Sequence, residues 1–553
     1  MTRARFTTET RIFLAVFLLG FLFVAYTQHA WEDYWITFRA SRNLATGHGL
    51  VFTPGERVHS FTSPLGVLLP AGLSWLTGNG PEDLVLWLFR LVSLTALAGG
   101  MVLVYAILNS LALRPWSIGL TLALIALDAK TLDFSTNGME TGLLLFFLAW
   151  SLHGVFIAGP RQHLRLGLGW AGLMWTRPDG CIYIAALSLG ALLFLRREPA
   201  AAAPKPWLGK LLRAGLICAV LYLPWFLWAW WYYGSPVPHT IVAKGTNQAP
   251  LNLAEVAAGL VTFPFEHLLD PAASIWWTFL PSYASLATWH YPVVAVCALA
   301  AWAAALAWLC PLIRPATRML SLAFYLCHYF LTDIVRHYFP WYLPGVALLG
   351  YLVLGLWFDE LLGVAGHLPQ WHADRGWLRH ARAVLLGVAL VFLAVETGLT
   401  CCVGRLARVQ QRLIEDGGRH RIGLWLHDHA ASPRDTVMLE PLGYIGYFSG
   451  LKMYDYPGLS SKEMVAVRRR LGRENQNQAF LELKPDWMVL RPVEVSGNLL
   501  IDSTRLAEFY EPVLMMDVSA QVDAIRWLPG RRDLTGDEVF LIYHRKSPPK
   551  PAN

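Results

Sequence analysis

Charged residues are scarce in this chain of 553 residues, of which only 15% are Asp, Glu, Lys or Arg and 55% are hydrophobic. Soluble domains usually contain about 25% charged residues. Residues 12–31 contain no charged residue at all, and a run of about 20 such residues is what a membrane-spanning helix needs. The composition therefore excludes an ordinary soluble protein and predicts a polytopic α-helical membrane protein.

Motifs for disulfides, zinc and nucleotides are also lacking. The seven cysteines lie in or beside apolar runs without zinc-ligand spacing, and none follows Cys402, which argues against a disulfide framework or a structural metal. The glycines between Tyr444 and Gly450 match neither G-x-G-x-x-G nor G-x-x-x-x-G-K-[ST], so we expect no phosphate loop there. The net charge of +7 comes from basic residues beside apolar segments, and no nucleic-acid partner is expected.

Apolar runs separated by short polar loops divide residues 1–401. We predict about eleven spans, near residues 12–31, 91–113, 116–127, 141–160, 166–176, 181–195, 214–231, 290–310, 319–331, 340–357 and 383–400. The apolar stretch 64–76 is short and contains Pro70, which favours a re-entrant or surface helix. The distribution of basic residues puts the N-terminus inside and the first polar segment and the C-terminus outside.

Residues 402–553 contain no run long enough to span a membrane. Their periodicity predicts helices and strands in alternation: helices from Arg405 to His429 and from Lys462 to Leu483, and strands from Thr436 to Glu440, Trp487 to Arg491 and Val539 to Tyr543. We therefore expect a C-terminal soluble α/β domain, 402–553, on the periplasmic side.

Two adjacent carboxylates, Glu32 and Asp33, open the first polar segment, 31–64. Ionised groups at the membrane surface are costly unless they have a partner or a role, so the pair is a predicted functional site. The alternative is an interfacial pair that lipid headgroups solvate. We expect an extended or turning segment in which the two side chains point in different directions. The pair could also hold Mg²⁺ or Mn²⁺.

Nearly every later outer loop keeps a charged residue close to the membrane, which predicts that these loops converge on one anionic ligand. The candidates in these loops are Lys130, Asn137, Glu140, Arg177, Asp179, His239, Lys244 and Arg336.

Several motifs resemble a known family when they are taken in order. Glu32-Asp33-Tyr34-Trp35-Ile36-Thr37-Phe38-Arg39, followed by residues 40–52, 54–58 and 62–65, resembles the first outer loop of a branch of the glycosyltransferase C superfamily. That branch includes the mycobacterial arabinofuranosyltransferases. Shorter matches are Asn137-Gly138-Met139-Glu140-Thr141, Thr176-Arg177-Pro178-Asp179-Gly180, Tyr233-Gly234-Ser235-Pro236-Val237-Pro238-His239-Thr240 and Lys484-Pro485-Asp486-Trp487. The chain departs from the family at Glu32, where relatives usually have Asp, and at residues 58–61, where an acid is missing.

The resemblance implies a glycosyltransferase domain over residues 1–401 with a catalytic first outer loop, 31–64. Such enzymes move one sugar from a polyprenyl-phosphate donor at the outer face of the bacterial plasma (inner) membrane, which agrees with the missing nucleotide motif. The acceptor would be an envelope glycan, a lipopolysaccharide or a glycoprotein, and the sugar a pentofuranose by analogy with the arabinofuranosyl relatives.

The resemblance also suggests roles for the polar residues. Asp33 would be the base or charge stabiliser, and Glu32 would orient it or share its charge. Cations suit the departing phosphate, and those expected there are Arg177, Lys244, Lys130 and Arg336. The residues expected to bind substrate are Arg39, His59, Asn137, Glu140, Asp179 and His239.

Structural alternatives stand beside these roles. Arg177 could form only a local ion pair with Asp179, and Arg39 could pair with Glu32 or Glu56 to hold the shape of the loop. Lys244 could be an ordinary loop lysine.

Two other functions compete with sugar transfer. A secondary transporter would also have charges within the membrane, although such proteins usually show two related halves that are not apparent here. A non-catalytic envelope-assembly protein would not depend on the acid pair.

Overall fold

The computed structural model describes residues 6–195, 207–248, 252–269, 277–280, 291–334, 339–367, 376–496 and 501–546. The chain forms two compact units. Unit 1 comprises Met1–Tyr26, Arg90–Pro224 and Leu251–Arg405, and unit 2 comprises Thr27–Phe89, Trp225–Pro250 and Leu406–Asn553. Each unit is therefore built from segments that are far apart in the sequence, and the predicted division at residues 401 and 402 stays a prediction.

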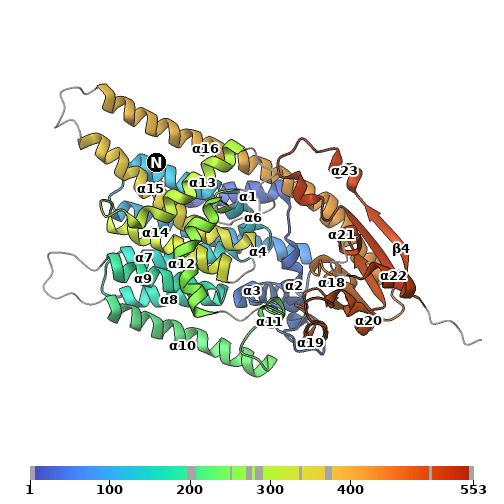
Figure 1. The fold of residues 1–553 in the computed structure, drawn as a ribbon. Helices are drawn as coiled ribbons and strands as arrows, with labels where there is room; N and C mark the ends of the chain where they lie inside the picture. Colours follow the sequence, from blue (N-terminus) through green and yellow to red (C-terminus); the bar gives the residue numbers. More distant parts are fainter. Residues whose placement is uncertain are drawn as a thin grey trace, which may run out of the picture. The chain divides into compact units, whose positions relative to one another are not determined.

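Unit 1 is helical (Figure 1). Its helices are α1 (Thr8–Thr27), α5 (Pro115–Leu127), α6 (Ala129–Thr136), α7 (Thr141–Phe156), α8 (Gln162–Thr176), α9 (Gly180–Phe194), α12 (Leu253–Leu269), α13 (Tyr291–Leu306), α14 (Pro315–Tyr329) and α15 (Leu343–His367). Three long helices contribute residues to both units: α4 (Glu82–Ser110), α10 (Trp207–Tyr233) and α16 (Gly376–Gln410).

Among the described residues, 6 helical segments are long and apolar enough to cross a membrane, or up to 7 if the bent pair α6 and α7 is one span. The chain is thus a multi-pass membrane protein, as its composition predicts. The predicted count of eleven spans is not confirmed, because runs such as α5 and α9 fold into helices of 13 and 15 residues, shorter than the roughly 20 residues of an ordinary span.

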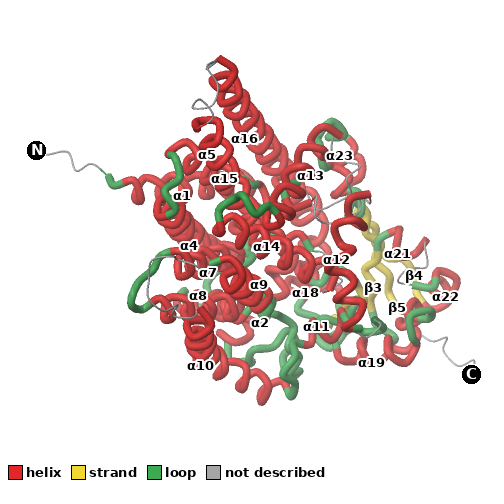
Figure 2. The backbone as a smooth tube through the Cα atoms, turned by 60° about the vertical axis from the view of Figure 1, so that its left-hand side comes forward, coloured by secondary structure: helices red, strands yellow, loops and turns green. Residues whose placement is uncertain are grey.

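Unit 2 contains a five-stranded sheet with the strand order β2-β1-β3-β5-β4. Figure 2 shows its strands in yellow. The strands are β1 (Thr436–Leu439), β2 (Lys452–Asp455), β3 (Trp487–Leu490), β4 (Tyr510–Asp517) and β5 (Val539–Arg545). Strand β1 pairs in parallel with β2 and β3, whereas β5 runs antiparallel to β3 and β4. An α/β fold for the tail is therefore correct, although β2 and β4 were not predicted.

The remaining helices of unit 2 are mostly short. They are α2 (Glu32–Ala45), α3 (Pro64–Leu76), α11 (His239–Lys244), α17 (His420–His429), α18 (Gly443–Ser449), α19 (Lys462–Leu471), α20 (Ala479–Leu483), α21 (Pro492–Ser496), α22 (Ser503–Phe509) and α23 (Ser519–Asp523), with a π-helix at Gln411–Arg419. The predicted helix at residues 462–483 breaks after α19, where Gly472 has a φ of 71°.

The core of unit 2 joins the first polar segment to the tail. Ile36 of α2 and Phe52 pack in one buried cluster with Val437 of β1, Val489 of β3 and Ile542 of β5. Local signals fix α3, since Pro64 occupies its first turn and the Ser63 side chain accepts a hydrogen bond from the Gly66 N–H. The first polar segment is thus part of the same folded body as the sheet.

Candidate active site

The two candidate acids occupy the first turn of a helix. Glu32 and Asp33 are the first two residues of α2, where carboxylates interact favourably with the helix dipole. The expectation of an extended or turning segment is therefore wrong at this point. In an α-helix, neighbouring residues point about 100° apart, so the expectation of different directions for the two side chains fits the helix.

Glu32 is directed at the tail. Its side-chain Oε1 accepts a hydrogen bond from the backbone N–H of Gly443, the first residue of α18. Burial raises the pKa of Glu32 well above its usual value, the cation of Arg419 opposes this shift, and the charge of Asp33 adds to it. Glu32 and Asp33 are both half-buried.

Arg39 also turns toward the tail. Its guanidinium donates to the carbonyl oxygens of Gly446 at 2.5 Å, Gly450 at 2.8 Å and Leu451 at 3.0 Å. Its carbon Cζ lies 4.3 Å from the centroid of the Phe52 ring. Burial lowers the pKa of Arg39 to about 10. These hydrogen bonds are with carbonyl groups of the tail rather than with Glu32 or Glu56. Arg39 therefore holds the first polar segment through partners that the sequence did not suggest.

The two candidate histidines meet in unit 2. The His239 N–H donates to the carbonyl oxygen of His59 at 3.1 Å, and the His59 ring stacks on Tyr233 with centroids 4.3 Å apart. Burial and, to a smaller extent, the neighbouring His239 together lower the pKa of His59 to about 4. His59 is therefore neutral at physiological pH and packs as an aromatic ring.

Lys244 is the last residue of α11 and is half-buried. Two hydrogen bonds connect α11 and the residues after it to the tail. The side chain of Arg468 donates to the carbonyl oxygen of Ala243 at 3.2 Å, and the side chain of Asn247 donates to the carbonyl oxygen of Arg468 at 3.1 Å. Five more candidates share unit 2 with Lys244: Glu32, Asp33, Arg39, His59 and His239.

Three candidates of unit 1 form one ionic cluster. Arg177 donates through Nε to Asp179 Oδ1 at 2.9 Å and through Nη1 to Glu140 Oε1 at 3.1 Å. Its carbon Cζ lies 4.7 Å from the centroid of the Tyr342 ring. The ion pair with Asp179 that the sequence offered as an alternative exists, and Glu140 is a second carboxylate on the same cation. The cluster carries two acids for one base, so its net charge is negative when all three groups are ionised.

Lys130 and Asn137 have nearby acidic partners. Lys130 is only 1% exposed, lies 3.7 Å from a carboxylate oxygen of Asp128, and donates to the carbonyl oxygen of Leu280. Asn137 donates to Asp133 at 3.3 Å in the bend between α6 and α7. Arg336 lies outside the described residues.

A divalent metal does not fit the acid pair as a shared ligand. Glu32 Oε1 is occupied by the Gly443 N–H, and helix geometry directs the Asp33 side chain about 100° away. Within the described ranges, no group of three or more His, Cys, Asp or Glu residues could hold a metal ion. We therefore assign no step to a metal.

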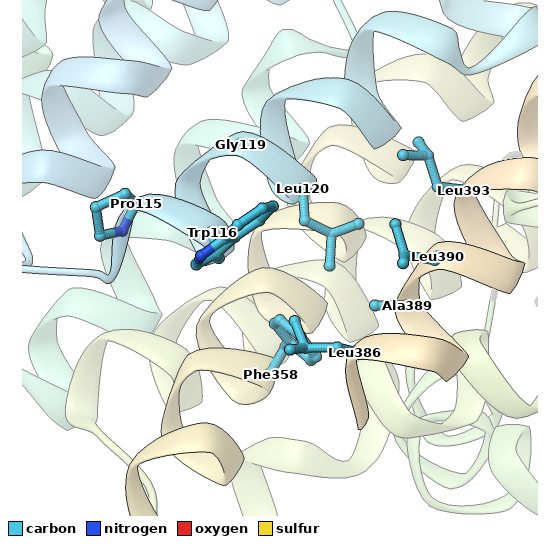
Figure 3. Close-up of a pocket in the computed structure, with 9 residues that line it drawn as sticks. All are labelled: Pro115, Trp116, Gly119, Leu120, Phe358, Leu386, Ala389, Leu390 and Leu393. Carbon is cyan, nitrogen blue, oxygen red and sulfur yellow. The ribbon is translucent and has the colours of Figure 1, made fainter. Parts of the chain in front are cut away.

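Unit 1 also contains an apolar pocket of about 460 Å³ (Figure 3). Its lining residues are Pro115, Trp116, Gly119, Leu120, Phe358, Leu386, Ala389, Leu390 and Leu393, from α5, α15 and α16. None of the candidate polar residues lines it, so it is not the predicted active site.

Sequence reasoning missed the partners of these candidates. Arg419 and Gly443 act on Glu32, Tyr233 stacks on His59, and Tyr342 lies beside Arg177. One signal was available, since two acids followed by apolar residues with helical spacing are typical of a helix start. The partners themselves are hundreds of residues away in the sequence and left no local pattern.

Two curated proteins are similar to part of the chain. The terminal beta-(1->2)-arabinofuranosyltransferase of Corynebacterium glutamicum is 31% identical over 268 residues, 43% of this chain and 36% of that protein. The protein of the same name in Mycobacterium tuberculosis is 28% identical over 242 residues, 39% of this chain and 35% of that protein. The matched part thus spans about a third of the length of these relatives.

The fold and the tail give two further similarities. The oligosaccharyltransferase of Archaeoglobus fulgidus, in its apo form, superposes with a TM-score of 0.55 over 94% of this chain and 74% of that chain, at 12% identity. Residues 407–543 match a domain of unknown function, DUF8728. The chain is a multi-pass membrane protein whose fold is like that of the Archaeoglobus oligosaccharyltransferase, and the resemblance of its motifs to arabinofuranosyltransferases agrees with the two curated relatives.

Proposed function

We propose that the protein is a membrane glycosyltransferase that moves a single sugar from a polyprenyl-phosphate donor to an envelope glycan, lipopolysaccharide or glycoprotein acceptor. One observation carries this proposal: the chain combines a glycosyltransferase C fold with 31% identity over 268 residues to a named arabinofuranosyltransferase. The names of both curated relatives favour arabinofuranose as the sugar. The proposed location is the periplasmic face of the inner membrane.

The chemical step is assigned to Asp33. An acceptor hydroxyl attacks the anomeric carbon, the bond from that carbon to the phosphate oxygen breaks, and the lipid phosphate leaves as an anion. Asp33 takes the hydroxyl proton as a general base, or its charge stabilises the sugar cation as the bond to phosphate opens. Asp33 keeps the acid of the motif at residues 32–39, whereas Glu32 stands where relatives usually have Asp, and this supports the choice of Asp33 as the reacting acid.

Phosphate binding is assigned first to Arg177 and Lys244. Charge-assisted hydrogen bonds from these cations would stabilise the departing phosphate. The two carboxylates beside Arg177 would hold its guanidinium in position. Lys130 is a weaker candidate, because it is 1% exposed and paired with Asp128. Arg336 keeps the role that the resemblance suggests, without structural support.

The remaining substrate contacts are assigned as the resemblance implies. Asn137, Glu140, Asp179 and His239 would recognise sugar hydroxyls. Arg39 and His59 are each only 6% exposed and pack against neighbouring residues. They are therefore better explained as residues that support the fold of unit 2.

Sugar transfer by the purified full chain tests the proposal. The protein in lipid nanodiscs is incubated with radiolabelled polyprenyl-phosphate arabinose, and with a panel of polyprenyl-phosphate hexoses, in the presence of candidate envelope glycans. We expect label in the glycan with one donor, and no label with nanodiscs that carry an unrelated membrane protein. Parallel reactions with EDTA, Mg²⁺ or Mn²⁺ test metal dependence. Absence of transfer from every donor, together with solute uptake by proteoliposomes, would instead support a transporter.

A further inference from the structure

One face of α2 is occupied by the tail. Glu32, Trp35 and Arg39 recur at intervals of three and four residues, which places them on one face of the helix. Glu32 accepts the N–H of Gly443, the first residue of α18. Arg39 donates to the carbonyl oxygen of Gly446 and to two carbonyl oxygens just after the end of α18. Figure 1 shows the two helices side by side within unit 2.

The two charged residues match the two ends of α18. Free N–H groups and a partial positive charge mark the start of a helix, and free carbonyl groups and a partial negative charge mark its end. Glu32 presents a carboxyl group to the start, and Arg39 presents a cation to the end. Glu32 and Arg39 are seven positions apart in α2, which corresponds to a rise of about 10 Å. This is also the approximate length of the seven-residue helix α18. We call this arrangement the α2–α18 clamp.

Aromatic packing fills the space between the two ends of the clamp. The ring centroid of Trp35 lies 5.1 Å from that of Tyr444, 4.9 Å from that of Tyr447 and 4.9 Å from that of Phe448. Trp35 is 3% exposed. Aromatic pairs at these distances contribute about 0.5–1.5 kcal/mol each beyond the burial of their area. The clamp is therefore a packed interface along its whole length.

Glycine permits the close approach of the two helices. A Cβ atom added to Gly443 would overlap the backbone carbonyl oxygen of Glu32. Because that neighbour is backbone, it cannot swing aside as a flexible side chain would. A Cβ atom at Gly446 would lie 2.9 Å from the Phe52 ring. The absence of a side chain at Gly443 thus allows the start of α18 to contact the start of α2.

Buried charges lie behind Glu32. Arg419, which acts electrostatically on Glu32, donates to Glu415 at 2.8 Å and to Asp537 at 2.8 Å. Asp537 also accepts from Arg491 at 2.8 Å. Arg419 therefore has two carboxylate partners of its own, and it does not depend on ionised Glu32 for its stability. A neutral side chain with an accepting oxygen would satisfy the Gly443 N–H equally well.

From this geometry we infer that Glu32 is a positioning residue: by clamping the first turn of α2 to α18, it fixes the direction of Asp33, and the tail is thereby a structural part of the active site. The inference rests on the proposed function of Asp33. It differs from the expectation that Glu32 shares the charge of Asp33 in the reaction, because Glu32 accepts a hydrogen bond from the backbone of the tail.

The test compares four variants of the full chain in nanodiscs. Glu32→Ala removes the accepting oxygen, and Glu32→Gln keeps an accepting oxygen without the charge. Gly443→Ala pushes α2 and α18 apart by a change in the tail rather than in α2. Gly72→Ala is the matched control, since Gly72 also lies in a helix of unit 2 and nothing lies within 4 Å of an added Cβ atom. For each variant, kcat and the donor KM are measured, together with hydrogen exchange of residues 32–45.

We expect Glu32→Ala and Gly443→Ala to lower kcat by roughly 10–100-fold with a donor KM within about threefold of wild type, since misplacement by about 1 Å can cost about 10²-fold. Exchange of residues 32–45 should become faster in both. Glu32→Gln should recover at least about tenfold in kcat relative to Glu32→Ala, and its exchange should match wild type. Gly72→Ala should match wild type in both measurements.

Two results would overturn the inference. If Glu32→Gln is as inactive as Glu32→Ala while its exchange stays at the wild-type rate, the charge of Glu32 acts in the reaction and positioning is not its role. If Gly443→Ala keeps the wild-type kcat, the clamp does not direct Asp33. Wild-type protein that transfers no sugar would refute the proposed function instead, and the exchange rates would then still decide whether Glu32 and Gly443 dock α2 on the tail.

Discussion

Replacing Arg39 by methionine is a direct way to measure what the clamp contributes to stability. Methionine keeps the length of the side chain and its packing on Phe52, but it removes the guanidinium that serves the carbonyl groups of Gly446, Gly450 and Leu451. Each buried acceptor left without a donor costs about 1–3 kcal/mol. The Gly446 carbonyl also accepts the Gly450 N–H, and Gly450 is exposed. The Leu451 carbonyl is therefore the buried acceptor that loses its donor, at a cost of about 1–3 kcal/mol.

Part of this cost is offset. Burial lowers the pKa of Arg39 to about 10, so the charged side chain already loses hydration in the folded protein. We therefore expect a net loss of about 1–2 kcal/mol for Arg39→Met. A domain of about 150–250 residues loses roughly 2–4 °C in Tm per kcal/mol. The transition of unit 2 should then fall by roughly 2–8 °C.

Differential scanning calorimetry of the full chain in nanodiscs measures this shift. Arg434→Met is the control, because Arg434 is exposed and belongs to the same unit; its Tm should stay within about 1 °C of wild type. Arg39→Lys should fall between Arg39→Met and wild type, since a compact ammonium cannot match the planar fork of the guanidinium. An unchanged Tm for Arg39→Met, or an equal fall for Arg434→Met, would refute the reasoning.

Three further outcomes are expected. The pKa of His59, about 4, lies below the value of about 6.5 in the unfolded chain. The unfolded state therefore binds more protons below pH 6.5, and the stability of the folded state decreases as the pH falls. At pH 5 the loss is about 2 kcal/mol. His59→Phe should therefore lose less Tm than wild type between pH 7.5 and pH 5, and an equal loss would contradict the assignment. Arg177→Gln should destabilise unit 1 by about 3–5 kcal/mol by leaving buried carboxylates unpaired, and adding Glu140→Gln should restore part of the Tm; no recovery in the double variant would argue against the pair. Reporter fusions at Gly55 and after Asn553 should both report the periplasm, and a cytoplasmic signal from either would contradict the proposed topology.

The sequence was informative wherever a local pattern fixed the structure. Strands β1, β3 and β5 were predicted, because β1 and β3 are short, largely buried apolar runs and β5 begins with the apolar run from Val539 to Tyr543. Strand β4 was missed because it is an edge strand with Pro512 and mostly exposed residues, and β2 because it has a charged residue at each end, Lys452 and Asp455. Helix α3 has the same bounds as the apolar run 64–76.

The candidate site was predictable in its residues but not in their partners. The acid pair and the Arg177–Asp179 pair could be found from charge beside apolar runs, and the pairing of Arg177 with Asp179 needed only neighbours in the sequence. The contact of Glu32 with Gly443 joins residues 411 positions apart. No periodicity or charge pattern encodes such a contact, because it depends on how the first segment packs against the folded tail.

Turnover by Asp33→Asn is the most direct test of the central claim that a carboxylate at the start of α2 performs sugar transfer. Asparagine keeps the shape of the side chain and removes its charge. We expect kcat to fall by about 10²–10⁴-fold, while donor affinity, measured by binding of the polyprenyl-phosphate sugar to the same nanodiscs, stays within about threefold of wild type. Stable, membrane-inserted Asp33→Asn protein that transfers sugar at a near-normal rate would contradict the claim.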